Sequence, residues 1–200
     1  MDWGNLTLAE DGVDVAPAEY TRCTYELDLL ASDIPQPKLP LYYEIWNWEG
    51  DESVLPGKWH RVVRKCFGNQ WCDTHGITEK YFLQRYVHAQ EGKIFDPASF
   101  FFLTHRSDVV ATCFGWLGED QGVDVDECAQ KKVGMLHWLA VDPEHRKLGL
   151  GAALIQLVGQ RLKDLGYARC RLRTESFRTS ARRLYESQGF QMIREDPMTK

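Results

Sequence analysis

Residues 136–152 of this 200-residue chain read LHWLAVDPEHRKLGLGA. The first six are mainly apolar and predict the end of a strand, and after a polar run Gly149 and Gly151 predict a turn into a helix. The first turn of a helix has N–H groups without partners in the helix and lies at the positive end of its dipole. Because glycine has no Cβ atom, a ligand can approach these amides closely. The stretch therefore predicts an anion site that suits a pyrophosphate.

Two known phosphate-binding patterns do not fit this turn. A P-loop needs the pair Gly-Lys where Leu150 and Gly151 stand. The dinucleotide motif G-x-G-x-x-G needs a third glycine where Leu154 stands. From the glycine spacing alone, an ordinary turn that uses its glycines for tight packing remains equally open.

Strand and helix patterns alternate on both sides of the turn. Strands are predicted at residues 41–48, 100–104, 109–117, 133–141, 168–173 and 190–193. Amphipathic helices are predicted over residues 56–68, 78–86, 150–165 and 179–188. This order predicts one α/β (α+β) domain, residues 41–200, around a mixed sheet. Residues 1–40 are acidic and then proline-rich, and we expect an N-terminal extension that is partly flexible.

The composition is that of an average soluble globular protein, with 44% apolar and 26% charged residues. No run approaches 18 apolar residues and the acidic N-terminus lacks the features of a signal peptide, so we expect a cytoplasmic protein without a membrane partner. The net charge of −5 argues against a nucleic acid partner.

The charge is unevenly distributed along the chain. Residues 1–60 carry 12 acidic and 3 basic side chains, whereas residues 139–200 carry 7 acidic and 12 basic ones. The basic part suits an anionic ligand, and the acidic part would suit a cationic amine, although a solvated acidic surface is equally open. Three arginines that alternate with apolar residues are expected to form a mostly solvated strand face: Arg169, Arg171 and Arg173.

The six cysteines form no C-x-x-C pair. Cys66, Cys72 and His75 have no fourth ligand at a convincing spacing, so we expect no metal site. Cys113 and Cys170 alternate with apolar residues and are expected to be buried.

Two segments resemble the signatures of GNAT superfamily N-acetyltransferases. The run LAVDPEHRKLGLGA contains the pattern Q/R-x-x-G-x-G/A as Arg146, Gly149 and Gly151, and ARRLYESQGF at residues 181–190 is similar to A-x-x-L-Y-E-x-x-G-F. The resemblance implies the GNAT fold, a mixed, mostly antiparallel central sheet flanked by helices and splayed between its two central strands. It also implies acetyl-CoA as cosubstrate and no metal.

The resemblance assigns roles by position. Leu139, Ala140 and Val141 would pair with the pantetheine arm of CoA. The pyrophosphate would lie against a run of seven residues: Arg146, Lys147, Leu148, Gly149, Leu150, Gly151 and Ala152. Tyr185 would protonate the departing thiolate, with a core aromatic as the alternative. The family often has asparagine where this chain has Arg178, which could reach a CoA phosphate instead.

Acyl transfer to an amine also needs a proton acceptor, because the amine attacks in its neutral form. His137 is the first candidate, since L-H-x-L-A-V resembles the strand in arylalkylamine N-acetyltransferases where a histidine serves a proton relay. In a regular strand His137 shares a side with Leu139 and Val141, unless a bulge intervenes. Glu119, next to Asp120, is the second candidate, with solvated loop charges as the alternative.

These observations predict an acetyl-CoA-dependent N-acetyltransferase in which the amine attacks the thioester directly. Segments between residues 59 and 104 resemble mycothiol synthase, a GNAT member with two such domains, which favours a small-molecule amine or an amino-glycoside as acceptor. A protein or peptide N-acetyltransferase and a non-catalytic acyl-CoA sensor are the alternatives. A homodimer is compatible with the sequence.

Overall fold

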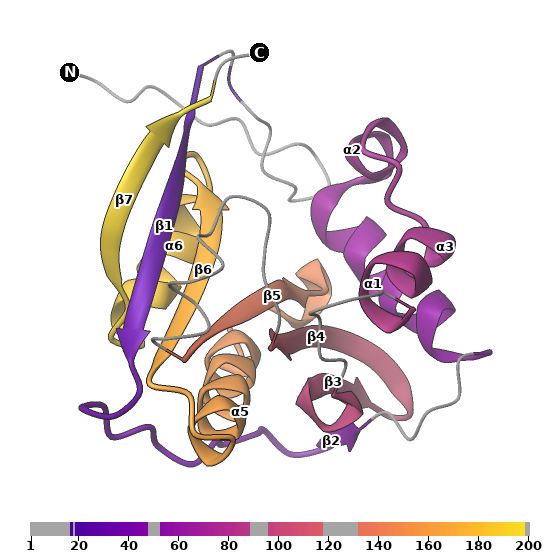
Figure 1. The fold of residues 1–200 in the computed structure, drawn as a ribbon. Coiled ribbons are helices and arrows are strands. Elements are labelled where there is room, and N and C mark those ends of the chain that lie inside the picture. The colour runs from indigo at the N-terminus through magenta and orange to yellow at the C-terminus, as the bar shows by residue number, and fades with distance from the viewer. Residues whose placement is uncertain (1–16, 18, 48–52, 89–95, 118–131, 199–200) are drawn as a thin grey trace.

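The computed structural model describes residues 17, 19–47, 53–88, 96–117 and 132–198. In these residues seven strands form one sheet in the order β2-β3-β4-β5-β6-β1-β7 (Figure 1). The strands are β1 (Thr21–Asp28), β2 (Tyr43–Asn47), β3 (Phe100–His105), β4 (Asp108–Trp116), β5 (Val133–Val141), β6 (Arg169–Glu175) and β7 (Gln191–Pro197). Neighbouring strands are antiparallel except β5 and β6, which are parallel.

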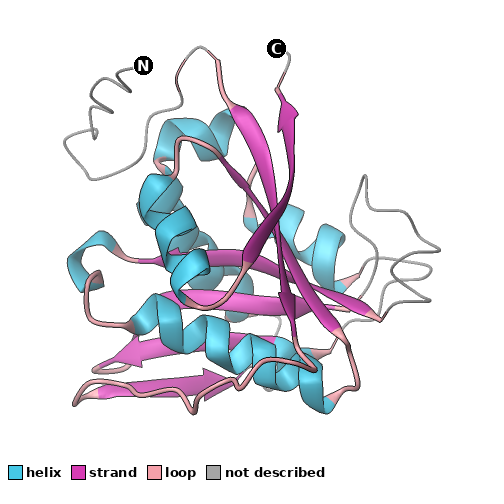
Figure 2. Cartoon of the chain, turned by 90° about the vertical axis from the view of Figure 1, so that its left-hand side faces the viewer, coloured by secondary structure: helices cyan, strands magenta, loops and turns pink. Residues whose placement is uncertain are grey.

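Helices cover both faces of the sheet, and two buried clusters fill the space beneath them. The helices are α1 (Leu55–Phe67), α2 (Asn69–Thr74), α3 (Glu79–Phe82), α5 (Leu150–Asp164) and α6 (Thr179–Ser187). Trp59, Val62 and Val63 of α1 belong to one cluster, whereas Leu154 of α5 and Tyr185 of α6 belong to the other. We call the two sides of the sheet the α1 face and the α5 face. Figure 2 shows the strong twist of the sheet, with the strand next to the C-terminus crossing the direction of the strands at the other end.

The helix and strand patterns of the sequence are confirmed, and local signals mark the ends of two predicted helices. Thr78 caps α3 by accepting a hydrogen bond from the N–H of Tyr81, at 3.0 Å. Gly68 ends α1 with a φ of 85°, which glycine adopts without steric cost. The hairpin between β3 and β4 turns at two residues, Arg106 and Ser107, both at positive φ, whereas the predicted strands 100–104 and 109–117 had left four residues between them.

Strand β1 is the element that the sequence analysis missed. Residues 21–28, which we expected in an N-terminal extension, form an inner strand that pairs with β6 on one side and β7 on the other. Cys23, Tyr25 and Leu27 are buried in the cluster on the α5 face, while Arg22 and Glu26 alternate with them. This two-residue period was visible in the sequence and would have predicted the strand.

Strand β1 also corrects the expectation of a solvated arginine face on β6. Arg171 is only 8% exposed, and its Nε and Nη2 donate to one carboxylate oxygen of Glu26 at 2.9 and 2.6 Å. Arg169 forms ion pairs with Glu26 and Asp28. The acidic residues of β1 therefore neutralise the basic residues of β6 across the ladder.

The parallel pairing of β5 and β6 is short. It joins Val133 to Arg169, Gly134 to Cys170 and Met135 to Arg171, and it ends there. Beyond these pairs the two strands diverge, which confirms the splayed sheet. Within the described part of the chain, no helix combines the length and the apolar character that a membrane span requires.

Candidate active site

A cavity of about 840 Å³ lies where β5 and β6 diverge. Part of its wall belongs to the α5 face, including Leu139, Val141 and Tyr185. Another part belongs to the α1 face and is aromatic: Phe67, Trp71, Tyr81, Tyr86 and Trp138. Because the strands no longer pair here, the cavity reaches both faces of the sheet.

A bulge in β5 distributes its side chains between the two faces. His137 lies opposite Phe114 of β4 and Ala140 lies opposite Thr112, so the ladder shifts by one residue between these pairs. Trp138 sits in the shifted part with a φ of 53°, which is rare for a large side chain. The side chains of His137 and Trp138 consequently both contact residues of the α1 face.

His137 is therefore separated from Leu139 and Val141, which pack on the α5 face. In a regular strand the three would have shared a side. The imidazole stacks on Phe114 with ring centres 5.7 Å apart, and the rings of Tyr86 and Trp116 lie 5.9 and 6.5 Å away. The structure thus places this candidate base in an aromatic part of the cavity wall.

The phenol of Tyr86 forms a hydrogen bond within this aromatic wall. Its oxygen accepts a hydrogen bond from Nε1 of Trp138 at 2.7 Å. Burial, together with the neighbouring Tyr81, raises the pKa of Tyr86 well above its ordinary value, so this phenol stays neutral. Its hydrogen bond therefore fixes the Trp138 side chain at the bulge. The second candidate base, Glu119, and its neighbour Asp120 lie outside the described residues.

The N-terminus of α5 opens into the same cavity. Gly149 precedes the helix in a left-handed conformation, and no described side chain caps the first turn. The first helical hydrogen bond runs from the N–H of Ala153 to the carbonyl of Gly149. The N–H groups of Leu150, Gly151 and Ala152 therefore have no partner within the helix, and these residues line the cavity.

Arg146 and Lys147 line the cavity beside this turn, whereas Leu148 does not belong to the cavity wall and is 44% exposed. Nε of Arg146 donates to the carbonyl of Val141 at 3.1 Å, which ties the turn to the end of β5. His145, in a short 3₁₀ turn after β5, also lines the cavity, and its Nδ1 lies 2.8 Å from the hydroxyl of Tyr43.

The two glycines of the turn serve different purposes. At Gly149, with a φ of 81°, an added Cβ would meet no atom within 4 Å, so the backbone conformation is what requires glycine. At Gly151 an added Cβ would lie 2.8 Å from Cδ2 of Leu184 in α6. Tight packing, one of the two interpretations left open by the sequence, therefore holds at Gly151.

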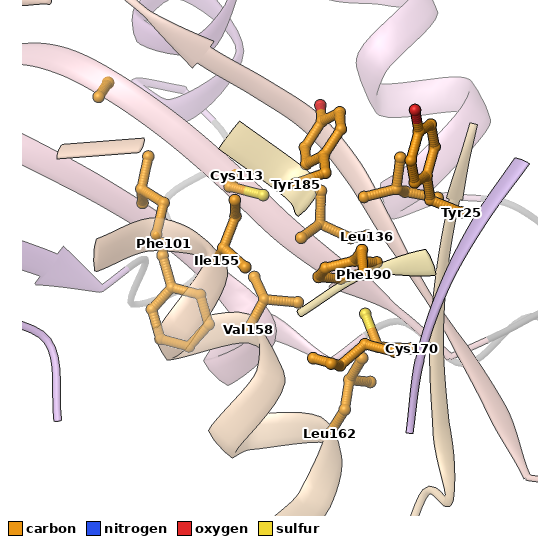
Figure 3. Close-up of a cluster of buried hydrophobic side chains, with 14 of the residues drawn as sticks. Tyr25, Phe101, Cys113, Leu136, Ile155, Val158, Leu162, Cys170, Tyr185 and Phe190 are labelled. Carbon is orange, nitrogen blue, oxygen red and sulfur yellow. The ribbon is translucent and has the colours of Figure 1, made fainter. Parts of the chain in front are cut away.

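Tyr185 reaches the cavity from α6. It is 7% exposed, and burial raises the pKa of its phenol well above the ordinary value. Figure 3 shows its hydroxyl directed away from the apolar side chains of Cys113 and Ile155, parallel to that of Tyr25. The ring is part of the core and also lines the cavity. Packing and a chemical role are thus compatible at this position.

Arg178 is at the N-cap position of α6 and extends toward α1. Its Nε donates to Oε2 of Glu175 at 2.6 Å, and its guanidinium lies 4.7 Å from the ring centre of Phe67 and 5.1 Å from that of Phe177. The side chain is only 12% exposed. In the structure its contacts are thus with Glu175, Phe67 and Phe177.

Sequence reasoning missed the residues that build the α1 side of the cavity. Arg22 was overlooked because β1 was, and the sequence predicted no site role for Phe67 or Trp71. Cys66 also lines the cavity, but burial raises the pKa of its thiol to about 12, so the thiol stays protonated. Among the described residues, no three His, Cys, Asp or Glu side chains are grouped as metal ligands would be.

The comparisons with known proteins agree with the geometry of the site. The model of the acetyltransferase (GNAT) family matches residues 58–190, and the chain belongs to this family. Among curated relatives, a mycothiol acetyltransferase from Thermobispora bispora is 29% identical over 163 residues, which cover 80% of this chain and 50% of the relative. Human N-acetyltransferase 8 is 40% identical over 68 residues, which cover 34% of this chain and 30% of the relative. The chain thus spans half or less of these relatives.

Solved structures share the fold at low sequence identity. A GCN5-related N-acetyltransferase from Sphaerobacter thermophilus superimposes with a TM-score of 0.61 and 18% identity over 90% of this chain and 50% of its own. The ribosomal-protein-S18-alanine N-acetyltransferase from Escherichia coli superimposes with a TM-score of 0.52 and 23% identity over 74% of this chain and 77% of its own. The GNAT fold expected from the sequence is therefore confirmed.

Proposed function

We propose that the protein transfers an acetyl group from acetyl-CoA to a primary amine. The observation that carries this proposal is the cavity at the splay of β5 and β6, which contains an uncapped helix N-terminus and two groups suited to proton transfer on opposite faces of the sheet. Membership of the GNAT family supports it. The location in the cytoplasm, the homodimer and the absence of nucleic acid and membrane partners stay predictions from the sequence.

The residues present fit CoA on the α5 face. After Met135 the edge of β5 that faces β6 has no ladder partner, so the backbone of Leu139 to Val141 can pair with the amides of a pantetheine arm. The free amides of Leu150 to Ala152 suit a pyrophosphate, and Arg146 and Lys147 add positive charge beside them. Bound there, acetyl-CoA supplies the activated acetyl group.

Two side chains would handle the protons. His137 lies on the α1 face and would accept the proton of the attacking amine, directly or through water. Tyr185 lies on the α5 face and would donate to the departing thiolate. Because burial raises its pKa, Tyr185 remains a proton donor and cannot serve as the base. The amine would thus enter from one face of the sheet and the thiol would leave toward the other.

The acceptor is proposed to be a small-molecule amine. The α1 side of the cavity is lined by aromatic side chains from α1, α2 and the segment after α3. These side chains suit a compact acceptor molecule with a planar or apolar part. The similarity to mycothiol acetyltransferases supports this choice. The experiment below tests this proposal against two alternatives, a peptide acceptor and a non-catalytic acyl-CoA sensor.

Thiol release from acetyl-CoA, measured over amines, amino-glycosides and peptides, tests the proposal. We expect turnover with at least one small amine and none with peptides. His137→Gln should lower turnover and change the pH–rate profile, while CoA affinity stays within about twofold. Tight CoA binding without turnover on any acceptor would leave only the sensor, and an unchanged pH–rate profile in His137→Gln would remove this residue from the proton transfer.

A further inference from the structure

Strand β6 brings charged side chains to the α1 side of the cavity, beyond the end of its ladder with β5. Arg173 and Glu175 both line the cavity, and Leu172, which precedes Arg173, is buried in the cluster on the α5 face. Since side chains alternate along a strand, Arg173 and Glu175 lie on the α1 face. Arg22 of β1 is directly opposite Glu175 and also lines the cavity.

Among the described residues of this part of the wall, positive charge exceeds negative charge. Three guanidinium groups, of Arg22, Arg173 and Arg178, face the cavity together with one carboxylate, that of Glu175. Glu175 accepts a hydrogen bond from Arg178. Among the described residues no carboxylate lies within ion-pair distance of Arg22, and both Arg22 and Arg173 are half-buried. The partly desolvated guanidinium group of Arg22 would be stabilised by an anion that reaches it.

The register lets two of these arginines act on one group. Arg22 pairs with Glu175 and Thr24 pairs with Arg173, so Arg22 and Arg173 are diagonal neighbours on the two strands. Such neighbours have Cα atoms roughly 7–8 Å apart, within reach for two long side chains to converge on one small anion. Guanidinium groups bind carboxylates through paired N–H donors.

The anion at this place is not a phosphate of CoA. The uncapped amides that suit the pyrophosphate belong to α5, which packs on the opposite face of the sheet. The arginines of β1 and β6 are on the α1 face, together with the aromatic wall formed by Phe67 and Trp71. The anion would therefore belong to the molecule that enters from this face, which is the acceptor.

The strand register also places this anion relative to the candidate base. Met135 and Arg171 form the last pair of the parallel ladder, and His137 and Arg173 each follow two residues later on the same face. At about 3.3 Å per residue, each lies roughly 7 Å beyond the end of the ladder, on opposite walls of the cavity. An acceptor between them would direct its amine to His137 and its anion to Arg173.

We propose that the acceptor is an amino acid or a close derivative, with a free carboxylate and an apolar or aromatic body as well as the amine. Arg22 and Arg173 bind the carboxylate, and Phe67 and Trp71 bind the body. This inference rests on the proposed function, because it names the substrate class of the same site. It adds a specificity determinant that does not take part in proton transfer.

A matched pair of acceptors tests the inference. L-Phenylalanine and phenethylamine share the amine and the aromatic body and differ in the carboxylate. We expect wild-type protein to acetylate phenylalanine with the lower KM. Arg22→Gln and Arg173→Gln should each raise the KM for phenylalanine roughly tenfold or more while leaving that for phenethylamine within about twofold. Arg183→Gln, at an exposed position of α6 outside the cavity wall, should change neither and serves as the control.

Binding without acetyl-CoA separates this inference from the proposed function. Trp71 and Trp138 line the cavity, so tryptophan fluorescence reports acceptor binding directly. Phenylalanine bound more tightly than phenethylamine, with the preference lost in Arg22→Gln, supports the carboxylate site even if neither amine is acetylated, in which case the transferase proposal fails alone. Equal binding of the two amines, binding of neither, or equal losses for both in the variants overturns the carboxylate site. Thermal unfolding of each variant verifies that it is folded.

Discussion

Gly151 of α5 and Leu184 of α6 approach so closely that a methyl group on Gly151 would lie 2.8 Å from Cδ2 of the leucine. Two helices that both border the cavity therefore meet at the first turn of α5. Gly151 permits this packing, and its N–H has no partner within the helix. A substitution there affects helix packing and, in the proposed function, the phosphate site.

Gly151→Ala should lower the affinity for CoA, whereas its cost in the free energy of unfolding should stay below about 1 kcal/mol. The added methyl meets only the end of the Leu184 side chain, which can shift, and alanine favours the helix more than glycine does. The double variant Gly151→Ala/Leu184→Ala removes the clashing side chain and separates the two effects. We expect its CoA affinity, measured by calorimetry, to remain below that of Leu184→Ala alone, because the methyl still stands beside the phosphates. Equal CoA affinity of these two variants would assign Gly151 to packing only.

Tyr185→Phe should reduce kcat by roughly 10²-fold or more if the phenol donates the proton to the thiolate. CoA affinity should stay within about threefold, since the ring and its packing are kept. Burial raises the pKa of Tyr185 above its ordinary value near 10, so in wild-type protein its ionisation should cause no fall in rate up to about pH 10. Steady-state kinetics across this pH range provide the measurement.

Tyr25→Phe is the matched control for that experiment. The Tyr25 ring lies 6.1 Å from the Tyr185 ring, but its hydroxyl donates to Glu186 and accepts from Arg182, and the residue does not line the cavity. Its loss should lower thermal stability and leave kcat nearly unchanged. Equal losses of kcat in both variants would point to a packing role for Tyr185.

Arg178→Asn distinguishes two interpretations of the arginine at the N-cap of α6. In the structure its guanidinium contacts Glu175 and the Phe67 ring on the α1 side. The substitution should therefore change the KM of the acceptor and lower stability by about 1–3 kcal/mol, because Glu175 loses a charged partner. Titration with CoA should show an affinity within about twofold of wild type. A tenfold loss of CoA affinity would favour the phosphate contact instead.

The sequence predicted features that depend on neighbouring residues, and it did not predict those that depend on residues far along the chain. The turn at Gly149, the cap at Thr78 and the end of α1 at Gly68 depend on neighbouring residues, and each was predictable. Strand β1 depends on β6 and β7, more than 140 residues later, although its two-residue period was present in the sequence. Pairing at such a separation leaves no local signal beyond that period.

The part of the cavity wall formed by the turn into α5 was visible in the sequence, and the part on the α1 face much less so. The bulge at Trp138 leaves His137 on the α1 face with Met135 and places Leu139 and Val141 on the α5 face, and it arises from the register of β5 against β4. Arg178 lies over Phe67 because its side chain extends from the start of α6 to the end of α1. Side chains that converge from separate elements become visible only in the folded chain.

The ion pair between Glu26 and Arg171 tests whether β1 is an integral part of this fold. Arg171 is almost fully buried and donates twice to Glu26, so Glu26→Gln should destabilise the protein by about 2–3 kcal/mol, somewhat less than a fully buried pair would cost. For a chain of this size that corresponds to a fall in Tm of roughly 4–12 °C. Glu26→Gln/Arg171→Met removes the buried charge as well and should recover part of the loss. If the single variant unfolds at the wild-type temperature, β1 contributes little through this pair and its apolar side chains alone hold it between β6 and β7.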